Sequence, residues 1–403
     1  MGFTEGSLPE GKISAEIMSV LPRVCERLPV IIELSSDAVA LDAIPAKLEG
    51  FEFKCDLAII NAIAGTISPD QIQSLAAKPS VYKVYPDKMV QACLNVATPA
   101  LRAHLIQQRG TTGKSVTAAV VDTGVHPHPD LTRPENRLVA FADFVGKKGS
   151  PYDDNGHGTH VAGEIAGNGY SSNGRYKGIA PEARIAGVKV LDQNGKGQTS
   201  TVIQGLDWCL KNRSRHNIRV VNLSMGSPAG SPPHEDPLCK AVERLWDAGI
   251  VVLVAAGNDG PADKTILSPG NDPKVITIGA MDDKRTVERK DDAIADFSAR
   301  GPTAEGLAKP DILAPGVGIT SLKVPKGSPG FRLRGSSRTY QALSGTSMAT
   351  SLAAGVAVLM LDHEPGLTPD EVKQRMMSSA ENRGYDANVQ GRGYIDANKA
   401  VRP

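Results

Sequence analysis

The sequence predicts an α/β protein, with a doubly wound, mostly parallel sheet preceded by a small α+β unit. The chain has 403 residues, which is longer than one hydrophobic core usually allows and favours two domains, one of them large. In the longer C-terminal part, continuously apolar runs alternate with helical patterns, as is typical of parallel strands buried on both faces. Between about residues 28 and 90, short apolar runs alternate with helix-like segments, which indicates the small α+β unit.

The N-terminal unit is expected to alternate strands with helices. Its apolar runs are bounded by polar segments, and a polar helical stretch separates the first run from the second. In chain order, the predicted elements are LPVIIELS at 28–35, the polar helical stretch, FEFKCDLAIINAIAG at 51–65, the helix SPDQIQSLAAK at 68–78 and VYKVYP at 81–86.

The connection between the two parts is expected at residues 91–114. This segment contains Pro99 and Gly110 among mixed polar residues, and both residue types interrupt regular structure. We therefore predict an irregular linker here, and we place the domain boundary inside it. The two predicted domains are residues 1–95 and 96–403.

The C-terminal part contains five strand-like runs. They are apolar throughout and contain many β-branched residues, as expected for the inner strands of a parallel sheet. The runs are SVTAAVVD at 115–122, RIAGVKVL at 184–191, RVVNLSMG at 219–226, IVVLVAAGN at 250–258 and KVITIGAM at 274–281. With right-handed crossovers, ligands of such a sheet gather at the carboxyl ends of its strands.

Two helices of this part have clear start signals. Asp236 followed by Pro237 is an N-cap with proline at the first helical position. Thr368 and Glu371 have the spacing of a capping box, with Leu367 and Val372 placed as a hydrophobic staple. The first of these helices has one apolar face, made of Leu238, Ala241, Val242, Leu245 and Trp246.

The bulk composition excludes several classes of protein. Charged residues make up 22% and hydrophobic residues 40%, as in an ordinary globular chain. The formal charge of +1 provides no field that would steer nucleic acid or an acidic membrane surface. The longest apolar run, 353–361, is too short to span a bilayer. Residues 1–30 lack a signal-peptide pattern, so we expect a cytoplasmic protein, although a chain whose export signal had been removed would look the same.

The five cysteines are few, odd in number and scattered, which fits neither a disulfide framework nor a zinc knuckle. We expect reduced thiols, and the sequence leaves open whether Cys209 and Cys239 could meet. The five are Cys25, Cys55, Cys93, Cys209 and Cys239.

Asp122 and His157 are the first two candidate reactive residues. Asp122 ends an apolar strand before Gly124, which permits a sharp exit, although such an aspartate can also be a turn former or a helix cap. His157 lies between two glycines at the start of a helix in DDNGHGTHVAGEIAG. Small neighbours would let a substrate backbone approach the imidazole, while the alternative is a structural histidine.

Ser347 and Asn258 complete the candidate site. Ser347 lies at the head of an apolar helix in LSGTSMATSLAAG, where unpaired N–H groups and the helix dipole would stabilise an oxyanion. The alternative is that Ser347 only caps the helix. Asn258 ends another strand and could donate a hydrogen bond to the same oxyanion, or could belong to an Asn-Asp-Gly turn. A serine nucleophile needs a base, and the base needs a carboxylate, which His157 and Asp122 would supply.

Four segments of the sequence together resemble the signature motifs of the subtilases, the subtilisin-like serine proteases. They are Asp122-Thr123-Gly124, His157-Gly158-Thr159-His160, Ala256-Gly257-Asn258 and Gly345-Thr346-Ser347-Met348-Ala349. The resemblance extends from about Gly110 to Ala397. Within the family, YDDNGHGTH, LSPG at 267–270, FSARGP and KPDILAPG are most similar to the intracellular alkaline, AprX-type branch.

The resemblance implies a serine endopeptidase with defined roles. Asp122 would orient His157, His157 would act as general base and then general acid, and Ser347 would be the acylated nucleophile. Asn258 and the Ser347 N–H would form the oxyanion hole, and the chemistry would need no cofactor. The residues implied to bind substrate are Ser224, Met225 and Gly226 as an edge strand, and Ala255, Ala256 and Gly257 as a wall of the specificity pocket. Neither segment carries a charge, so an uncharged, fairly large P1 side chain is expected.

The N-terminal unit resembles the small ferredoxin-like prosegment of the family, which assists folding and inhibits the enzyme. The resemblance therefore implies a self-processing zymogen, cut between about Lys88 and Thr98. Its partners would be protein and peptide substrates and its own prosegment, with no nucleic acid and no membrane.

Two positions depart from the family pattern. Ser351 stands where subtilases usually have proline, four residues after the nucleophile, which could alter the rigidity of the helix. The loop 168–177 does not match the calcium-binding insertion of secreted subtilisins, so a structural calcium ion remains an open question. The acidic pairs Asp282-Asp283 and Asp291-Asp292 could hold a cation, but solvated surface charge is the favoured interpretation.

Three other hypotheses are kept. The Asp-Thr-Gly motif also occurs in aspartic proteases, but a single copy leaves His157 and Ser347 unexplained. A metal site could use His157 and His160, with His126 and His128, although the glutamate of a zincin helix is absent. The third hypothesis is a catalytically inactive subtilase-fold binding protein, which usually lacks a triad residue, whereas none is lost here.

Overall fold

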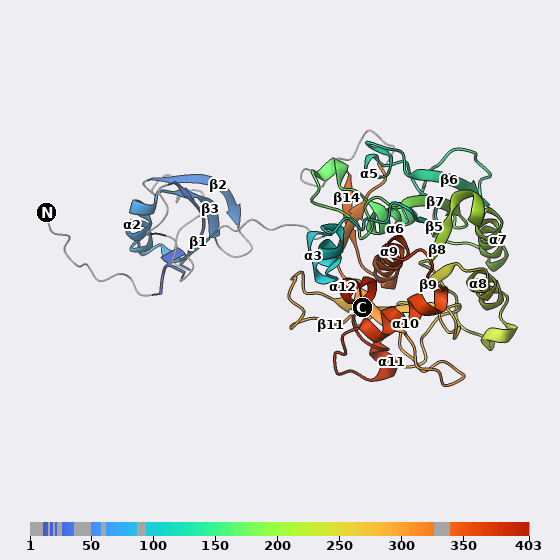
Figure 1. The fold of residues 1–403 in the computed structure, drawn as a ribbon. Helices are drawn as coiled ribbons and strands as arrows, with labels where there is room; N and C mark the ends of the chain where they lie inside the picture. The colour runs from blue at the N-terminus through green and yellow to red at the C-terminus, as the bar shows by residue number, and fades with distance from the viewer. Residues whose placement is uncertain are drawn as a thin grey trace. The chain divides into compact units, whose positions relative to one another are not determined.

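The computed structural model describes residues 11–14, 17–18, 21, 26–35, 50–57, 62–86, 94–325 and 339–402. The chain divides into two compact units, residues 1–91 and 92–403, so the division follows residue 91, whereas the sequence analysis placed it after residue 95 (Figure 1). Each unit has its own hydrophobic core.

The N-terminal unit contains a four-stranded antiparallel sheet with strand order β2-β3-β1-β4. Alternate residues of β1 are buried against a short helix and the other strands, as expected for a sheet with one solvated face. The elements are β1 Leu28–Leu34, β2 Phe51–Leu57, β3 Ala62–Ile67, a 3₁₀ turn Pro69–Gln71, α2 Ile72–Ala76 and β4 Val81–Pro86. The predicted polar helix between β1 and β2 falls on residues outside the described ones.

The C-terminal unit is built on a mainly parallel sheet with strand order β11-β10-β9-β8-β5-β7-β6, in which β12 also pairs with β10. All described pairings are parallel except that of β10 with β11. The fold class predicted from the sequence is confirmed, and each of the five predicted runs overlaps a strand. The strands are β5 Thr117–Asp122, β6 Leu138–Asp143, β7 Arg184–Lys189, β8 Ile218–Leu223, β9 Val251–Ala255, β10 Ile276–Asp282, β11 Ala293–Ile294 and β12 Ile312–Pro315, with a separate hairpin of β13 Ile319–Leu322 and β14 Tyr340–Leu343.

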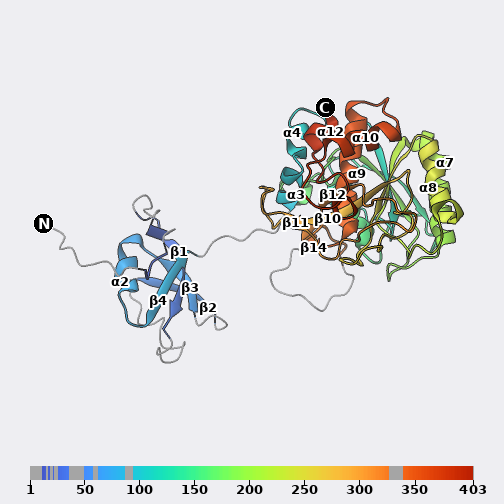
Figure 2. The same cartoon turned by 90° about the horizontal axis from the view of Figure 1, so that it is seen from below.

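Helices cover both faces of this sheet. Figures 1 and 2 show α7 and α8 side by side on one face, whereas α9 lies on the other face, where it packs against α6. The helices are α3 Leu94–Ala100, α4 Ala103–Gln107, α5 Pro129–Thr132, α6 His157–Ala166, α7 Thr199–His216, α8 Pro237–Asp247, α9 Thr346–His363, α10 Pro369–Ser379, α11 Ala387–Gln390 and α12 Ala397–Val401. Within the described residues, no helix is long and apolar enough to cross a membrane.

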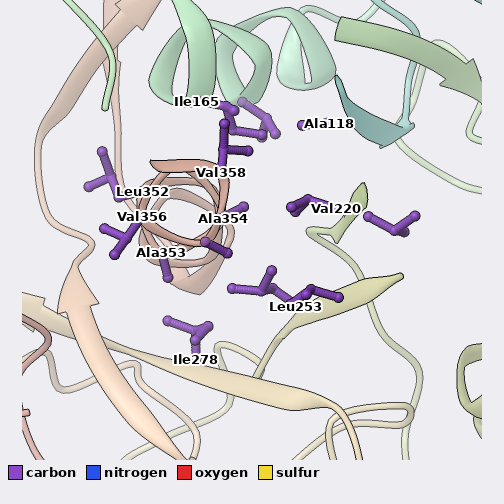
Figure 3. Packing of buried hydrophobic residues seen from close by; sticks show 14 of the residues in the cluster. Ala118, Ile165, Val220, Leu253, Ile278, Leu352, Ala353, Ala354, Val356 and Val358 are labelled. Carbon is purple, nitrogen blue, oxygen red and sulfur yellow. The ribbon is translucent and has the colours of Figure 1, made fainter. Parts of the chain in front are cut away.

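Helix α9 passes through the middle of the core. From Leu352 to Leu361 it is apolar on all sides, which is the pattern of a fully buried helix, and nearly all residues of α9 are buried. Figure 3 shows its side chains between helix α6 and the strands of the sheet. The labelled side chains are Leu352, Ala353, Ala354, Val356 and Val358 of α9, and Ala118, Ile165, Val220, Leu253 and Ile278 around it.

The two predicted helix starts are confirmed. The Asp236 side chain accepts a hydrogen bond from the Leu238 N–H at 2.7 Å. The Thr368 and Glu371 side chains form the predicted capping box at the start of α10.

The predicted irregular linker is wrong for part of its length, because residues 94–107 contain α3 and α4. Pro99 lies inside α3, and Arg102 breaks the two helices apart with φ 61°. Ala97, Leu101 and Ile106 are fully buried in the core of the C-terminal unit. Tertiary packing therefore decides the structure here, against the weak local propensity of a proline-containing segment.

Candidate active site

The carboxylate of Asp122 meets the imidazole of His157 at the carboxyl edge of the sheet. Asp122 is the last residue of β5 and is fully buried, and His157 is the first residue of α6. The Nδ1 atom of His157 lies 2.8 Å from Oδ1 and 3.0 Å from Oδ2 of Asp122. A hydrogen bond to Nδ1 fixes the tautomer of the ring and leaves Nε2 as its other polar atom.

Glycines next to His157 allow this close approach. A Cβ atom on Gly158 would lie 2.2 Å from the carbonyl oxygen of Gly124 and 3.1 Å from Cβ of Asp122. Gly156, the N-cap of α6, has φ 104°, which favours glycine. These glycines were expected to let substrate approach, but the space at Gly158 is needed for packing α6 against the end of β5.

Asp153 connects the loop after β5 to the start of α6 through hydrogen bonds. Its side chain is almost completely buried and accepts hydrogen bonds from the Thr123 hydroxyl at 3.0 Å, the Gly156 N–H at 2.8 Å and the Thr159 N–H at 2.9 Å. The Thr123 hydroxyl in turn accepts from the Gly158 N–H at 2.9 Å. Sequence reasoning missed this role, although an aspartate shortly before a helix start is a known capping signal.

The proton affinity of His157 is set by two opposing effects. Burial lowers its pKa, but the negative charge of Asp122 and the hydrogen bond to it outweigh burial and raise the pKa to about 9. The side chain remains 26% exposed, so Nε2 can be reached from the cavity that His157 lines. The pairing with Asp122 therefore favours the protonated form of His157.

Ser347 is the second residue of α9, directly over the end of β8. Its hydroxyl donates to the carbonyl oxygen of Ser224 at 3.1 Å, and the Ser224 hydroxyl donates to the carbonyl oxygen of Ser347 at 3.0 Å. Asn222 donates to the Ser224 hydroxyl at 2.9 Å. These hydrogen bonds fix the start of α9 on the edge of the sheet, where its first N–H groups have no partners within the helix.

Asn258 is held by Thr346. Its Oδ1 atom accepts from the Thr346 N–H at 2.9 Å and from the Thr346 hydroxyl at 3.0 Å. Because Oδ1 is bound, the group that Asn258 can offer to a ligand is its Nδ2 amide. Gly345 has φ 155°, and a Cβ atom there would lie 3.5 Å from that amide.

One cavity of about 440 Å³ brings the candidate residues together. His157, Asn258 and Ser347 line it, while Asp122 lies buried behind His157. Of the predicted substrate-binding residues, Ala256 is fully buried and does not line the cavity, because its backbone bonds Ile278 and Leu267. The other lining residues are Thr123, Asn155, Leu191, Gly195, Ser224, Met225, Gly226, Ala255, Gly257, Leu267 and Thr346.

Comparison with known proteins agrees with this geometry. Residues 113–394 match the Subtilase family. The chain belongs to the subtilase family. It is 48% identical to "Serine protease AprX" of Bacillus subtilis (strain 168) over 354 residues, which covers 85% of this chain and 79% of that protein.

Relatives of lower identity include two subtilisins. The chain is 35% identical to "Subtilisin E" of Bacillus subtilis (strain 168), over 85% of this chain and 81% of that protein. It is 34% identical to "Subtilisin DY" of Bacillus licheniformis, over 75% of this chain and 97% of that protein. The resemblance stated from the motifs is thereby confirmed, and this subtilase is a serine endopeptidase.

Two other histidines of this subtilase, His160 and His128, have structural surroundings. His160 Nε2 lies 3.0 Å from the carbonyl oxygen of Gln341, and His128 Nδ1 accepts from the Asp130 N–H at 3.1 Å. In the part of the chain that the structure describes, no three His, Cys, Asp or Glu side chains form a metal-binding group. Neither the zinc hypothesis nor the aspartic-protease hypothesis fits a subtilase.

Two acidic residues that were predicted to lie on the solvated surface are buried. Asp283 and Asp292 are 2% and 6% exposed, so the interpretation of solvated surface charge is wrong for them. Burial raises the pKa of each carboxyl group to about 6; the charge of Asp282 adds to the rise for Asp283, and the charge of Asp283 adds to the rise for Asp292. Their neighbours in sequence, Asp282 and Asp291, are the more exposed members of the two pairs.

Cys209 and Cys239 are free, buried thiols, as predicted. Burial raises the pKa of Cys209, so it stays protonated. The side chains of Cys25, Cys55 and Cys93 lie outside the described residues.

Proposed function

We propose that this subtilase hydrolyses peptide bonds through a triad of Asp122, His157 and Ser347. The observation that supports this most directly is the 2.8 Å contact of His157 Nδ1 with buried Asp122, combined with the presence of His157 and Ser347 in the same cavity. A serine hydroxyl becomes an effective nucleophile only with such a base beside it.

The proposed reaction begins when a substrate binds and the Ser347 hydroxyl turns from Ser224 toward Nε2 of neutral His157. The Ser347 oxygen attacks the scissile carbonyl carbon while Nε2 takes the hydroxyl proton. The resulting imidazolium is stabilised by Asp122, and Nε2 then gives the proton to the leaving amine. Water hydrolyses the acyl-enzyme by the same steps, with His157 again as the base.

The oxyanion would be stabilised by the Nδ2 amide of Asn258 and the N–H of Ser347. Thr346 holds the Asn258 side chain before substrate arrives, so the donor needs no reorganisation during the reaction. The dipole of α9 adds positive potential at the same point, because Ser347 lies in its first turn.

Substrate would bind by adding a strand to the edge formed by residues 224–226. Ala255, Gly257 and Leu267 offer an apolar wall in the same cavity, and none of them carries a charge. We therefore propose that the enzyme prefers uncharged, fairly large P1 side chains. A peptide library in which arginine or aspartate at P1 is cut fastest would overturn this preference.

Ser347→Ala tests the proposed function. Purified wild-type protein should degrade casein and be labelled at Ser347 by a phosphonylating serine reagent, whereas Ser347→Ala should do neither. Ser214→Ala, an exposed serine of α7, is the matched control and should behave as wild type. Wild-type protein that binds casein but never cuts it would support the inactive binding protein instead.

We further propose that the N-terminal unit is a prosegment which the enzyme removes itself. The predicted cut lies between Lys88 and Thr98, and in this interval Val96, Ala97 and Thr98 are buried in α3. Because proteases cut extended chain, we expect cleavage before Leu94. Intact mass and N-terminal sequencing should find a shortened wild-type chain and a full-length Ser347→Ala chain; identical products from both would contradict self-processing.

A further inference from the structure

A buried polar contact joins the two helices that carry the proposed base and nucleophile. The hydroxyl of Ser351 on α9 and Oε2 of Glu164 on α6 are hydrogen-bonded to each other, and both residues are fully buried. Ser351 lies one turn after Ser347, and Glu164 lies two turns after His157, so each is on the same side of its helix as the reactive residue.

The contact belongs to a small polar network. The Ser351 hydroxyl also lies within hydrogen-bonding distance of the backbone carbonyls of Met348, at 2.9 Å, and Ser347, at 3.2 Å. The other carboxylate oxygen of Glu164 lies 3.2 Å from Nδ1 of His160. The network thus extends from the backbone of the proposed nucleophile to the helix of the proposed base.

The Ser351 hydroxyl is the donor in this contact, and Oε2 of Glu164 is the acceptor. The nearby carbonyls of α9 are acceptors only, so they compete with Glu164 for the single hydroxyl proton. Burial raises the pKa of Glu164, and the opposing influence of His160 and Ser351 is smaller.

An interface of this kind does not need a carboxyl group for its stability. The surrounding contacts between α6 and α9 are apolar, for example those of Ile165 with Val358 (Figure 3). Apolar side chains of similar volume often stabilise a buried interface as well as a polar pair does. Apolar contacts tolerate small shifts along or around a helix, whereas a single hydrogen bond between buried groups is satisfied in one register only.

We propose that Glu164 and Ser351 are positioning residues whose contact holds α9 against α6 in the register that lets the Ser347 hydroxyl reach His157. The inference rests on the proposed function, in which Ser347 is the nucleophile and His157 the base. It also gives a role to the serine at 351, which the family resemblance left unexplained: proline at this position has no hydroxyl to offer to Glu164.

The first test compares Ser351→Ala with Thr350→Val. Each variant removes one buried hydroxyl from α9, but among the described residues the partner of the Thr350 hydroxyl lies in its own helix, namely the Thr346 carbonyl at 2.7 Å. Because a displacement of reacting groups by about 1 Å can lower a rate by up to about 100-fold, we expect kcat of Ser351→Ala to fall at least about 10-fold. KM should stay within about twofold, since the substrate-binding edge is untouched, and Thr350→Val should keep the wild-type kcat.

The second test changes both partners. Glu164→Gln retains hydrogen-bonding groups and should keep kcat within about twofold of wild type. In Glu164→Leu, kcat should fall by as much as in Ser351→Ala. The double variant Glu164→Leu/Ser351→Ala leaves no buried carboxyl group unpaired at this contact, so it should fold. Its kcat should fall no further than that of either single variant, because both substitutions remove the same contact.

The variants are compared as full-length chains, with kcat measured on a chromogenic peptide and thermal unfolding followed in parallel. Three results would contradict either the positioning role or the proposed function. A folded double variant with wild-type kcat would overturn the positioning role. Equal losses of kcat in Ser351→Ala and Thr350→Val would overturn it as well. If Ser347→Ala remained active, the proposed function itself would fail, and this outcome is distinct from the other two.

Discussion

At the scale of single residues, the proton on His157 controls when the site can work. The Asp122 carboxylate is buried and cannot be solvated by water, so it favours the charged imidazolium strongly enough to overcome the burial of the ring. A general base must be neutral to accept a proton. The same pairing that stabilises the imidazolium during the reaction therefore shifts the active pH range upward.

We predict that kcat/KM rises with pH through an apparent pKa of about 9, instead of the ordinary histidine value of 6.5. Asp122→Asn should lower this apparent pKa and reduce kcat by about 10⁴-fold. The measurement is a pH profile with a peptide ester or anilide. A wild-type midpoint below 6.5 would contradict the proposed pairing of His157 with Asp122.

Stability should change with pH through the same group. The raised pKa means that folded protein binds the proton more tightly than the unfolded chain does. The stabilisation by charged His157 is therefore complete below about pH 6.5 and is lost as pH rises through about 9. The enzyme thus becomes active as this contribution to its stability declines.

Another prediction concerns the oxyanion donor. Asn258→Ala removes the Nδ2 amide that Thr346 holds in place, so kcat should fall about 10²- to 10³-fold with little change in KM. Asp259→Ala alters the exposed neighbouring residue and serves as the control. A KM increase that accounts for the whole loss would assign Asn258 to substrate binding instead.

At the scale of elements, the parts predictable from sequence were those with a strong local pattern. The five buried strands were visible as continuous apolar runs, and α8 and α10 as capped starts, because burial on both faces and N-terminal capping each leave a local signature. Helix α3 was missed because its apolar residues surround Pro99 and its stability comes from contacts with the core.

In the candidate site too, the features with a local sequence pattern were predicted, whereas those that depend on tertiary contacts were not. The motifs identified Asp122, His157, Asn258 and Ser347, and the structure brings three of them to one cavity with the fourth behind it. The burial of Asp283 and the Ser351 contact with Glu164 depend on segments far apart in the sequence. No local pattern carries that information, so sequence reasoning could not supply it.

The junction of β5 with α6 gives a prediction about an element. In Gly158→Ala the new Cβ atom would lie 2.2 Å from the carbonyl oxygen of Gly124, so the first turn of α6 must move away from the strand. We expect a loss of about 1–3 kcal/mol in unfolding free energy and a fall in kcat of at least about 10-fold. Gly149→Ala, where no atom lies within 4 Å of the new group, is the control. Wild-type activity in Gly158→Ala would contradict the packing role.

At the scale of the whole molecule, lysine side chains supply positive charge to buried loops of the C-terminal unit. Lys189 is fully buried and its ammonium group donates to the carbonyls of Thr123 and Leu191, each at 2.7 Å. Lys309 bonds the carboxylate of Asp311 at 2.7 Å, and Lys373 donates to the Val275 carbonyl at 2.9 Å. Carbonyl and carboxylate oxygens are also the groups that a calcium ion would need, and in these loops the ammonium groups occupy them.

We therefore predict that removal of divalent metal leaves this subtilase active and stable. In excess EDTA, kcat and Tm should both stay at their values without EDTA. If the folded protein instead bound an ion present at 100 times its Kd, removing that ion would lower the unfolding free energy by about 2.7 kcal/mol and Tm by several degrees. Lys309→Met supplies the positive control: it leaves Asp311 buried without its nearest ammonium, which should cost about 3 kcal/mol and lower Tm with or without EDTA. A Tm that falls in EDTA and recovers with added calcium would show instead that the enzyme depends on an ion bound elsewhere in the chain.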